Sequence, residues 1–297
     1  MIRLGDLLQA TGGELVSGDL ALALPDFCYD SRLAEPGQLF VAVVTDTGDG
    51  HDYIEDALAR GAAGVMCQRR PAATPPPGVA WLIVENTQQA LLDYAAWVLQ
   101  ARQVEVVAIT GSVGKTSTKE AIAAVLGQRI SVFRNQGSYN GRYGLPIALG
   151  RLGPEKLAVL EMASDSLDEI RDLARLTRPR IGVVTTVGHS HVADLGGLKS
   201  IAVEKGRLIE ALPSDGLAVL NGDDPYVRRM SQLALAKCVT IGLHPENTYW
   251  ADDLRTDLDG TGCVIHEGLE QTVAAVPWVG LHHAYTMLNA YAVGRAY

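Results

Sequence analysis

A lysine preceded by glycine and followed by two hydroxyl residues is the clearest chemical signature of this chain. Glycines let backbone N–H groups turn inward around phosphates, and the start of a helix adds partial positive charge. Lys115 can then reach terminal phosphates, while the Thr116 hydroxyl can ligate Mg²⁺. The segment therefore predicts a nucleotide phosphate site formed by Thr110, Gly111, Ser112, Gly114, Lys115, Thr116 and Ser117.

The sequence on both sides of this loop predicts the elements that a phosphate site requires. Val106–Thr110 is an apolar run typical of a buried strand, and residues 118–127 predict a helix. The spacing departs from the common pattern GxxxxGKS/T, because Ile109 stands where the first glycine belongs. A chance GKTS sequence that binds no nucleotide is the alternative, and the strand, loop and helix order favours a phosphate loop.

Further polar residues follow other apolar runs. Glu161 comes directly after Leu157–Leu160, and a carboxylate at the end of a parallel strand borders the ligand crevice. We expect Glu161 to hold Mg²⁺, against the alternative of a helix cap or a surface acid. His189 and His191 follow the run Ile181–Thr185, and two such histidines can reach one site without defining a metal.

Two loops and one lysine also have ordinary structural explanations. Asn221–Asp224 consists of residues that favour turns. Asn135–Pro146 is a glycine-rich loop ahead of a helix, in which Arg142 can pair with a carboxylate or a phosphate. Taken alone, Lys205 is typical of a solvated lysine on a helix surface.

The order of these elements predicts an α/β chain with two domains. Apolar strands separated by helices over residues 103–297 predict a mainly parallel sheet flanked by helices. Within that part, Tyr249–Val276 is more typical of antiparallel strands. Residues 1–102 predict a small α/β domain that ends with a helix over Thr87–Ala101.

Net charge, cysteine spacing and the length of the apolar runs argue against several classes of protein. A formal net charge of −9 argues against general binding to nucleic acid or to anionic membranes. The four cysteines show no CxxC spacing, so neither a zinc knuckle nor a redox pair is indicated. No signal peptide is expected, and no apolar run approaches the roughly 20 residues that span a bilayer. We therefore expect a cytoplasmic monomer without membrane insertion.

Several segments resemble one family of enzymes. ITGSVGKTS resembles the phosphate loop of the Mur ligases, TGxxGKT/S, which has this spacing. Asp30–Arg32, Pro36–Ala42 and Asp49–Asp52 resemble the nucleotide-sugar-binding domain of that family. The stretch from His191 to Gly206 resembles its MurF branch. The resemblance covers the N-terminal and central domains of the family, and we expect the family's C-terminal domain to be absent.

The resemblance implies roles for individual residues. It implies a catalytic group of Lys115, His191 and Lys205, and magnesium binding by Thr116, Glu161, His191 and Lys205, of which the last can be carbamylated in the family. It implies nucleotide contacts from Asn221, Asp224 and His282, beside the phosphate loop. It implies substrate contacts from Ser31, Arg32, Asn140 and Arg142. The sequence departs from the family pattern at Gly141 and His283, each of which replaces an asparagine.

The activity implied by the resemblance is ATP-dependent amide formation in peptidoglycan precursor synthesis. ATP and Mg²⁺ would activate a carboxylate of a UDP-N-acetylmuramoyl tripeptide as an acyl phosphate, for attack by D-alanyl-D-alanine. Two alternatives stay open: a nucleotide-binding module without catalysis, or a related ligase with a different substrate. Turnover of ATP with these substrates discriminates among the three.

Overall fold

The chain folds into two compact units. The computed structural model describes residues 1–45, 48–71, 74–137, 139–188 and 197–297. Unit 1 consists of Met1–Gln103 and Tyr143–Pro154, and unit 2 consists of Val104–Arg142 and Glu155–Tyr297. The sequence predicts domains of residues 1–102 and 103–297; unit 1 instead extends to Gln103 and also includes Tyr143–Pro154.

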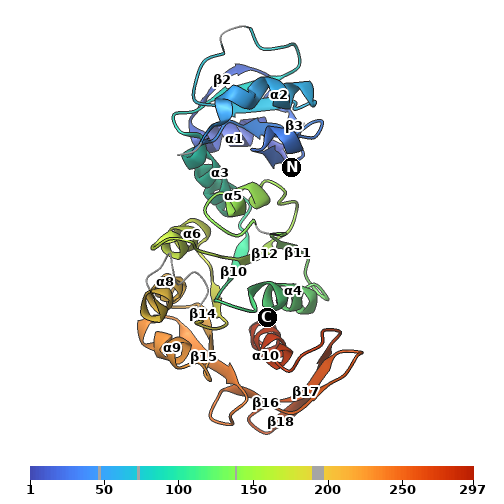
Figure 1. Ribbon diagram of the computed structural model, residues 1–297, viewed down its shortest axis with the longest axis vertical. Helices are drawn as coiled ribbons and strands as arrows, with labels where there is room; N and C mark the ends of the chain where they lie inside the picture. The colour runs from blue at the N-terminus through green and yellow to red at the C-terminus, as the bar shows by residue number, and fades with distance from the viewer. Residues whose placement is uncertain (46–47, 72–73, 138, 189–196) are drawn as a thin grey trace. The chain divides into compact units, whose positions relative to one another are not determined.

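Unit 1 is a small α/β fold (Figure 1). Its main sheet has the order β2-β9-β8-β5-β4, in which β2 is the antiparallel edge and the other neighbours are parallel. Buried side chains of the parallel strands, such as Phe40, Val65 and Trp81, form a core. Its elements are β1 Ile2–Arg3, α1 Leu4–Thr11, β2 Glu14–Ser17, β3 Ala23–Leu24, β4 Phe27–Cys28, η1 Ser31–Leu33, β5 Leu39–Val41, β6 Val44–Thr45, β7 Gly48–Asp49, η2 Gly50–Tyr53, α2 Ile54–Ala59, β8 Gly64–Cys67, β9 Ala80–Ile83 and α3 Thr87–Ala101.

A short helix from later in the sequence completes unit 1. Helix α5, Gly144–Leu149, buries Leu145, Ile147 and Leu149, because apolar side chains occur on nearly all of its faces. An ion pair of 2.5 Å between Arg151 and Asp26 holds the segment that follows. Sequence periodicity could not assign this segment to unit 1, because its apolar residues are equally suited to either core.

Unit 2 contains a larger, mainly parallel sheet. The strand order is β11-β12-β10-β13-β14-β15-β16-β17-β18, and every neighbouring pair from β11 to β16 is parallel. The fold class predicted from the sequence is therefore confirmed. The elements are β10 Glu105–Thr110, α4 Lys115–Leu126, β11 Val132–Arg134, β12 Leu157–Glu161, α6 Glu169–Thr177, β13 Ile181–Val184, α8 Leu198–Glu210, β14 Leu217–Asn221, α9 Pro225–Arg229, η3 Met230–Leu233, β15 Lys237–Gly242, β16 Tyr249–Thr256, β17 Thr261–Glu267, β18 Glu270–Val276 and α10 His283–Gly294.

Helices cover both faces of this sheet. Successive side chains of a strand point to opposite faces, so each strand contributes to two cores. Val183 and Val219 pack in a cluster with residues of α4 and α10. Val184 and Leu220 pack in another cluster with residues of α8 and α9. Burial on both faces explains why these strands are continuous apolar runs in the sequence.

The end of the sheet is antiparallel, as predicted for Tyr249–Val276. Strands β16, β17 and β18 pair as consecutive antiparallel neighbours. The side chains of β18 alternate little in burial and are mostly exposed, with Val273 at 83%. Strand β18 therefore forms an exposed edge of the sheet and adds little to the core.

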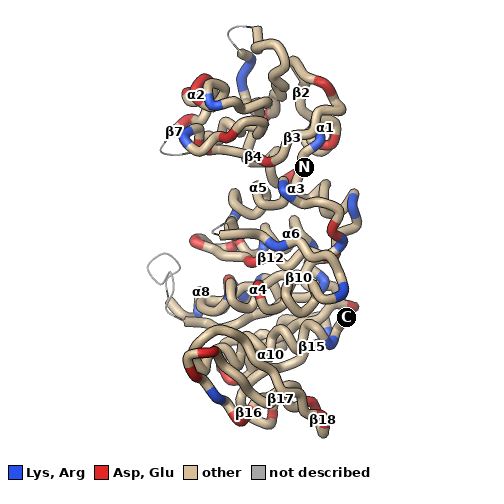
Figure 2. The backbone as a smooth tube through the Cα atoms, turned by 90° about the vertical axis from the view of Figure 1, so that its right-hand side faces the viewer, with Lys and Arg blue, Asp and Glu red and all other residues tan. Residues whose placement is uncertain are grey.

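Charge is distributed over both units. Figure 2 shows acidic and basic positions interspersed along the backbone of each unit. None of the helices in the described part of the chain combines the length and apolar character required to cross a membrane.

Candidate functional site

The phosphate loop joins β10 to α4 at the carboxyl edge of the parallel sheet. Gly111 has φ +149°, and a Cβ at this position would lie 1.9 Å from the Thr185 hydroxyl, so only glycine fits. Gly114 has φ +84° and directly precedes α4. The helix predicted from Thr118 therefore begins at Lys115, because Gly114 supplies the left-handed turn that starts it. The loop has the backbone shape expected of a phosphate site.

The side chain of Lys115 folds back over this loop. Its Nζ donates to the carbonyl of Gly111 at 2.9 Å and lies 3.5 Å from that of Ser112. Burial lowers the pKa of Lys115, against an opposing effect of Glu161. The ammonium group is thus held at the mouth of the loop, where it can bind a phosphate.

Other contacts of the phosphate loop hold its backbone in place. Thr110 is fully buried, and Ser112 accepts a 2.8 Å hydrogen bond from the backbone N–H of Gly188. Thr185 adds a 2.6 Å bond to the carbonyl of Val113. These contacts tie the loop to the end of β13 and fix its conformation before any ligand binds.

Thr116 and Glu161 meet beside the loop. The Thr116 hydroxyl donates a 2.8 Å hydrogen bond to Glu161 Oε2. Glu161 is the last residue of β12 and is 3% exposed. The structure thus brings together two of the four side chains predicted to bind magnesium.

Asn140 lies at the same carboxylate. Its Nδ2 donates a 2.8 Å hydrogen bond to Glu161 Oε1. Asn140 had been predicted as a substrate residue, and here it orients the predicted magnesium ligand. Arg142 is exposed, and its backbone N–H donates to Glu169 Oε1 at 2.8 Å. The two residues therefore have different surroundings, although both belong to one loop.

A buried lysine that the sequence did not single out completes this cluster. Lys119 is 1% exposed, and its Nζ donates to the carbonyl of Asn135 at 2.6 Å. The same Nζ lies 3.9 Å from Glu161 Oε2 and 3.3 Å from Glu120 Oε1. Its position four residues after Lys115, on the same helix face, is the only sequence signal that could have indicated this role.

Asn135 links that lysine to the backbone of Glu161. Asn135 Oδ1 accepts from the N–H of Glu161 at 2.9 Å, and Asn135 Nδ2 donates to the carbonyl of Glu161 at 3.0 Å. The side-chain amide of Asn135 thus bonds both backbone groups of Glu161, as a neighbouring strand would. Asn135 is 1% exposed, which leaves it no solvent partner.

Lys205 is buried in helix α8. It is 3% exposed, and burial together with the charge of Lys115 lowers the pKa of Lys205 to about 8. The surface location that its sequence alone suggests is wrong, because its face of α8 packs inward. The adjacent Glu204 accepts backbone N–H bonds from Asp168 and Ile170 at 2.5 and 2.7 Å, so it caps α6.

The predicted partner His191 lies outside the described residues, as does His189. Within the described ranges, no group of three or more His, Cys, Asp or Glu side chains is arranged to hold a metal ion. Of the four predicted magnesium ligands, Thr116, Glu161 and Lys205 lie in the described part of the chain, and the contact between Thr116 and Glu161 joins two of them.

A pocket of about 490 Å³ opens next to the phosphate loop. The pocket is lined by Val113, Gly114, Ser117, Thr118, Thr185, Thr186, Val187, Asn221, Asp223, Asp224, Pro225, Tyr226, His282, Tyr285, Thr286 and Asn289. It therefore brings all three predicted nucleoside residues, Asn221, Asp224 and His282, to the phosphate loop. Its volume is sufficient for a nucleoside, since small-molecule sites typically measure about 300–1,000 Å³.

Asp224, which lines this pocket, accepts hydrogen bonds from three backbone N–H groups. Its Oδ1 accepts from the backbone N–H groups of Tyr226 and Val227, which makes it the N-cap of α9. Its Oδ2 accepts from the N–H of Val187 at 2.8 Å. The carboxylate thus joins the ends of β13 and β14, and it is oriented by three donors.

Tyr285 is a pocket residue that the sequence did not indicate, and it contacts Asp223 of the segment Asn221–Asp224. The Tyr285 hydroxyl donates to Asp223 Oδ2 at 2.9 Å. Burial and this bond raise the pKa of Tyr285 to about 12. Tyr285 offers the pocket an aromatic ring, which is suited to stacking on a base.

In unit 1, Ser31 and Arg32 follow β4 at the carboxyl edge of the smaller sheet. Arg32 is 84% exposed in its side chain and forms two bonds to Asp30, of 2.9 and 2.7 Å. This pairing lowers the pKa of Asp30. Ser31 is 5% exposed. Arg32 therefore presents its guanidinium to solvent, whereas Ser31 faces inward.

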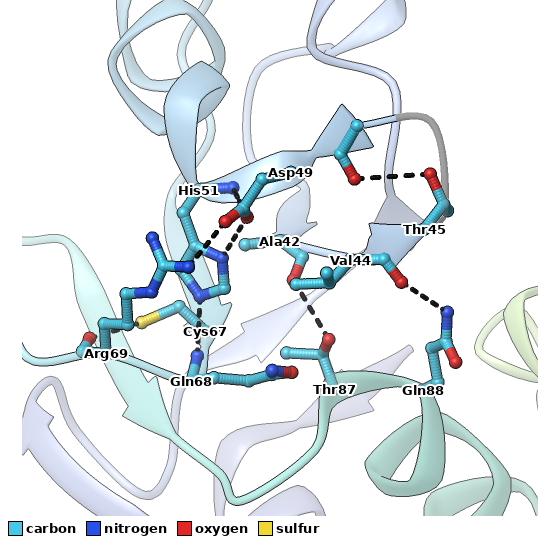
Figure 3. A network of polar contacts seen from close by, with 11 residues as sticks. Ala42, Val44, Thr45, Asp49, His51, Cys67, Gln68, Arg69, Thr87 and Gln88 are labelled. Atoms are coloured by element: carbon cyan, nitrogen blue, oxygen red, sulfur yellow. Dashed lines mark hydrogen bonds and ion pairs between the residues drawn. The ribbon is translucent and has the colours of Figure 1, made fainter.

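A polar network shapes the neighbouring loops of unit 1 (Figure 3). Asp49 lies 2.5 Å from His51 Nδ1, and His51 Nε2 accepts from the backbone N–H of Gln68 at 2.9 Å. His51 is therefore a donor at Nδ1 and an acceptor at Nε2. Hydrogen bonds from His51 lower the pKa of Asp49 to about 2. Arg69 reaches the same carboxylate at 2.6 Å, so the loops after β5 and β8 are tied together.

The sequence matches two profiles of one family. The profile described as Mur ligase middle domain matches residues 109–294. The profile described as Mur ligase family, catalytic domain, matches residues 27–134. Together they include the phosphate loop, Glu161, Lys205 and the pocket residues up to Asn289.

The two curated relatives described here have the same enzyme name. The UDP-N-acetylmuramoyl-tripeptide–D-alanyl-D-alanine ligase of Bacillus subtilis is 34% identical over 95% of this chain and 62% of its own length. The ligase of the same name from Escherichia coli is 32% identical over 99% of this chain and 65% of its own length. The chain thus spans less than two thirds of either relative.

Solved structures agree on the fold. A MurF ligase from Thermotoga maritima, in complex with ADP, superposes with a TM-score of 0.78 and 26% identity over 93% of this chain and 64% of its own. A MurF structure from Acinetobacter baumannii gives a TM-score of 0.87 at 23% identity, over 99% of this chain and 65% of its own. Because the middle-domain profile alone matches more than half of the sequence, the chain belongs to the Mur ligase family.

Proposed function

We propose that this chain carries the ATP-dependent amide ligation of the MurF type. The γ-phosphoryl group of ATP passes to a carboxylate of a UDP-N-acetylmuramoyl tripeptide, which gives an acyl phosphate and ADP. The amine of D-alanyl-D-alanine then attacks the acyl carbon, so an amide bond forms and phosphate leaves. The observation that carries this proposal is the contact of Thr116 with Glu161 directly beside a glycine-shaped phosphate loop. The names of the relatives supply the substrates.

The phosphate loop would position the reacting phosphates. Phosphoryl transfer depends chiefly on alignment and on neutralisation of charge. The backbone N–H groups at the start of α4 would donate to the phosphates, and Lys115 would exchange its 2.9 Å bond to Gly111 for a bond to a phosphate oxygen.

The residues beside the loop suit Mg²⁺. This cation prefers oxygen ligands and retains several waters. Thr116 Oγ1 and Glu161 Oε2 lie 2.8 Å apart and would both hold it, with His191 and Lys205 as the further predicted ligands. When bound, Mg²⁺ would neutralise charge on the transferred phosphoryl group. Asn140 keeps the second oxygen of Glu161 in place through its 2.8 Å bond.

The pocket that contains Asn221, Asp224 and His282 would hold the adenosine part of ATP. Unit 1 would bind the UDP end of the other substrate, with Arg32 as a forked donor for the diphosphate. The exposed guanidinium of Arg32 supports this assignment. Since ATP and nucleotide-linked precursors are cytoplasmic compounds, we place the reaction in the cytoplasm.

Lys205 is suited to carbamylation. Only a neutral amine attacks CO₂; its nitrogen forms the new N–C bond and releases a proton, which leaves a carbamate anion. With the pKa of Lys205 lowered to about 8, a neutral fraction exists near pH 8 and grows as pH rises. Below that pKa the ammonium predominates and the carbamate is lost.

We therefore expect a ¹³C carbamate resonance in protein equilibrated with ¹³C-bicarbonate at pH 8.5, and its disappearance at pH 6.5. The variant Lys205→Arg should lack this resonance. The variant Lys199→Arg, at an exposed position on the same helix, should keep it. A resonance that survives in Lys205→Arg would show that another amine is modified.

Phosphate release tests the proposed activity. The chain is incubated with ATP, Mg²⁺, the UDP-linked tripeptide and D-alanyl-D-alanine, and phosphate is followed with time. We expect release that depends on both substrates, and a loss of about a hundredfold or more in Lys115→Ala, because a preorganised charge is removed. Lys199→Ala, a change of an exposed lysine, serves as the control.

The same assay separates the alternatives. ATP binding without phosphate release under any substrate combination would favour a nucleotide-binding module. Release with a different nucleotide-linked carboxylate would favour a related ligase, to which the departures at Gly141 and His283 also point. Absence of any nucleotide binding would contradict the proposal as a whole.

A further inference from the structure

Three arginines form a stripe along helix α6. Arg171, Arg175 and Arg178 are spaced by four and three residues, which places them on one face of the helix. Together with Arg207 of α8 they line a pocket of about 690 Å³, whose other lining residues are Ala174, Glu210, Ala211 and Pro213. We call it the arginine pocket. The lining thus contains four arginines and one acidic residue, Glu210, in a chain with a formal net charge of −9, and Asp168 pairs with Arg171 and Arg207.

The arginine pocket is separate from the nucleotide pocket. The two share no lining residue. Strand β12 ends at Glu161 on the edge that carries the phosphate loop, and β13 runs parallel to it. Helix α6, which connects the two strands, must therefore run back toward the opposite edge. Arg175 and Arg178 lie at the end of α6, away from the phosphate loop.

Two of the four arginines are paired with carboxylates, and the other two are exposed. Arg171 pairs with Asp168 at 2.9 Å, and Arg207 pairs with Glu210 at 2.8 Å. The Nε atoms of both arginines are buried without a hydrogen bond, and that of Arg207 lies 3.5 Å from Asp168 Oδ1 in an ion pair. Arg175 and Arg178 form no ion pair within the described ranges of the chain. Buried donors without an acceptor are costly, so an anion in the pocket would stabilise this arrangement.

The backbone at Arg178 is also unusual. Arg178 ends α6 in the left-handed region, with φ 46° and ψ 61°. Glycine is favoured at this position of a helix end, because a side chain there is strained. Like charges spaced by four residues on a helix also repel. The backbone strain and the repulsion between like charges both destabilise the part of the protein that forms the arginine pocket.

We propose that the arginine pocket binds a soluble anion carrying two or more phosphate groups. Guanidinium groups match phosphate oxygens as planar, forked donors. A single carboxylate would leave most of the donors unsatisfied, whereas a diphosphate supplies oxygens for several guanidinium groups at once. A concave pocket of about 690 Å³ fits a small molecule. This site is independent of the ligase reaction.

Titration with inorganic pyrophosphate tests the proposal. Binding is measured calorimetrically without Mg²⁺ in the Lys115→Ala protein, in which the phosphate loop is weakened. We expect one site, bound at least tenfold more tightly than orthophosphate. In the same background, the double variant Arg175→Ala/Arg178→Ala should bind pyrophosphate at least about tenfold more weakly, since charge-assisted bonds are lost. Because both side chains are exposed, the double variant should fold normally, as circular dichroism will show.

Arg129→Ala, which removes an exposed arginine outside the pocket, is the matched control. Unchanged pyrophosphate affinity in the double variant would overturn the proposal. An equal loss in Arg129→Ala would also overturn it, because it would reveal only general charge attraction. A third arm uses vesicles that contain phosphatidylglycerol. Vesicle binding that depends on Arg175 and Arg178, without pyrophosphate binding, would assign the pocket to a membrane surface instead and so contradict a soluble ligand.

Discussion

Glu161→Gln is expected to lower ATP turnover by about a hundred- to a thousandfold, the effect typical of removing one charge-stabilising group from an active site. Glutamine keeps the shape of the side chain and can still accept the 2.8 Å bond from Thr116 or pair with Asn140. It lacks the negative charge that would hold Mg²⁺. The Mg²⁺ concentration for half-maximal phosphate release should therefore rise together with the loss of rate.

Phosphate release over a series of Mg²⁺ concentrations measures both effects. Glu270→Gln, a change of an exposed acid on β18, should leave the rate and the Mg²⁺ dependence as they are. If Glu161→Gln retained the original Mg²⁺ dependence, Glu161 would have no part in holding the cation, and its contact with Thr116 would be purely structural.

Lys119→Met is expected to lower the free energy of unfolding by about 3–5 kcal/mol, the range found when one partner of a buried ion pair is removed. Methionine fills the space but leaves the 3%-exposed Glu161 without the ammonium group 3.9 Å away. It also removes the 2.6 Å bond to the carbonyl of Asn135. Urea denaturation, followed by circular dichroism, measures the change.

A double variant distinguishes lost charge pairing from lost packing. In Lys119→Met/Glu161→Gln neither charge remains, so part of the lost stability should return. Lys199→Met, at an exposed position, controls for the substitution itself. If the double variant lost the sum of the two single effects, Lys119 and Glu161 would be energetically independent. Lys119 would then act through its contacts with Asn135 and Glu120.

The main features of the fold were predictable because they follow from local patterns. The strands around Val107, Val159, Val183 and Val219 are buried on both faces, and this burial leaves continuous apolar runs in the sequence. Segment α5 was assigned to the wrong compact unit, because which core receives an apolar helix is decided by distant contacts such as Arg151 with Asp26. The spacing of apolar residues within a helix does not indicate which of two cores the helix packs against.

Parts of the site were predictable for a similar reason. Glycines and hydroxyl residues around Lys115 must be contiguous to form a phosphate loop, so they leave a motif. Lys119 and Asn135 leave none, because they reach Glu161 from different elements and only in the folded chain. Tyr285 leaves none for the same reason, because it reaches Asp223 across 62 residues of sequence.

The phosphate loop, the alternation of strands and helices, and the family to which they belong could all be read from the sequence. Each is encoded by neighbouring residues, whose spacing is fixed by backbone geometry. Only the tertiary structure decided that Lys205 is buried, that Asn140 orients Glu161, and that four arginines surround one pocket. These properties depend on which surfaces meet when helices pack on the sheet, and packing joins residues that no local spacing relates.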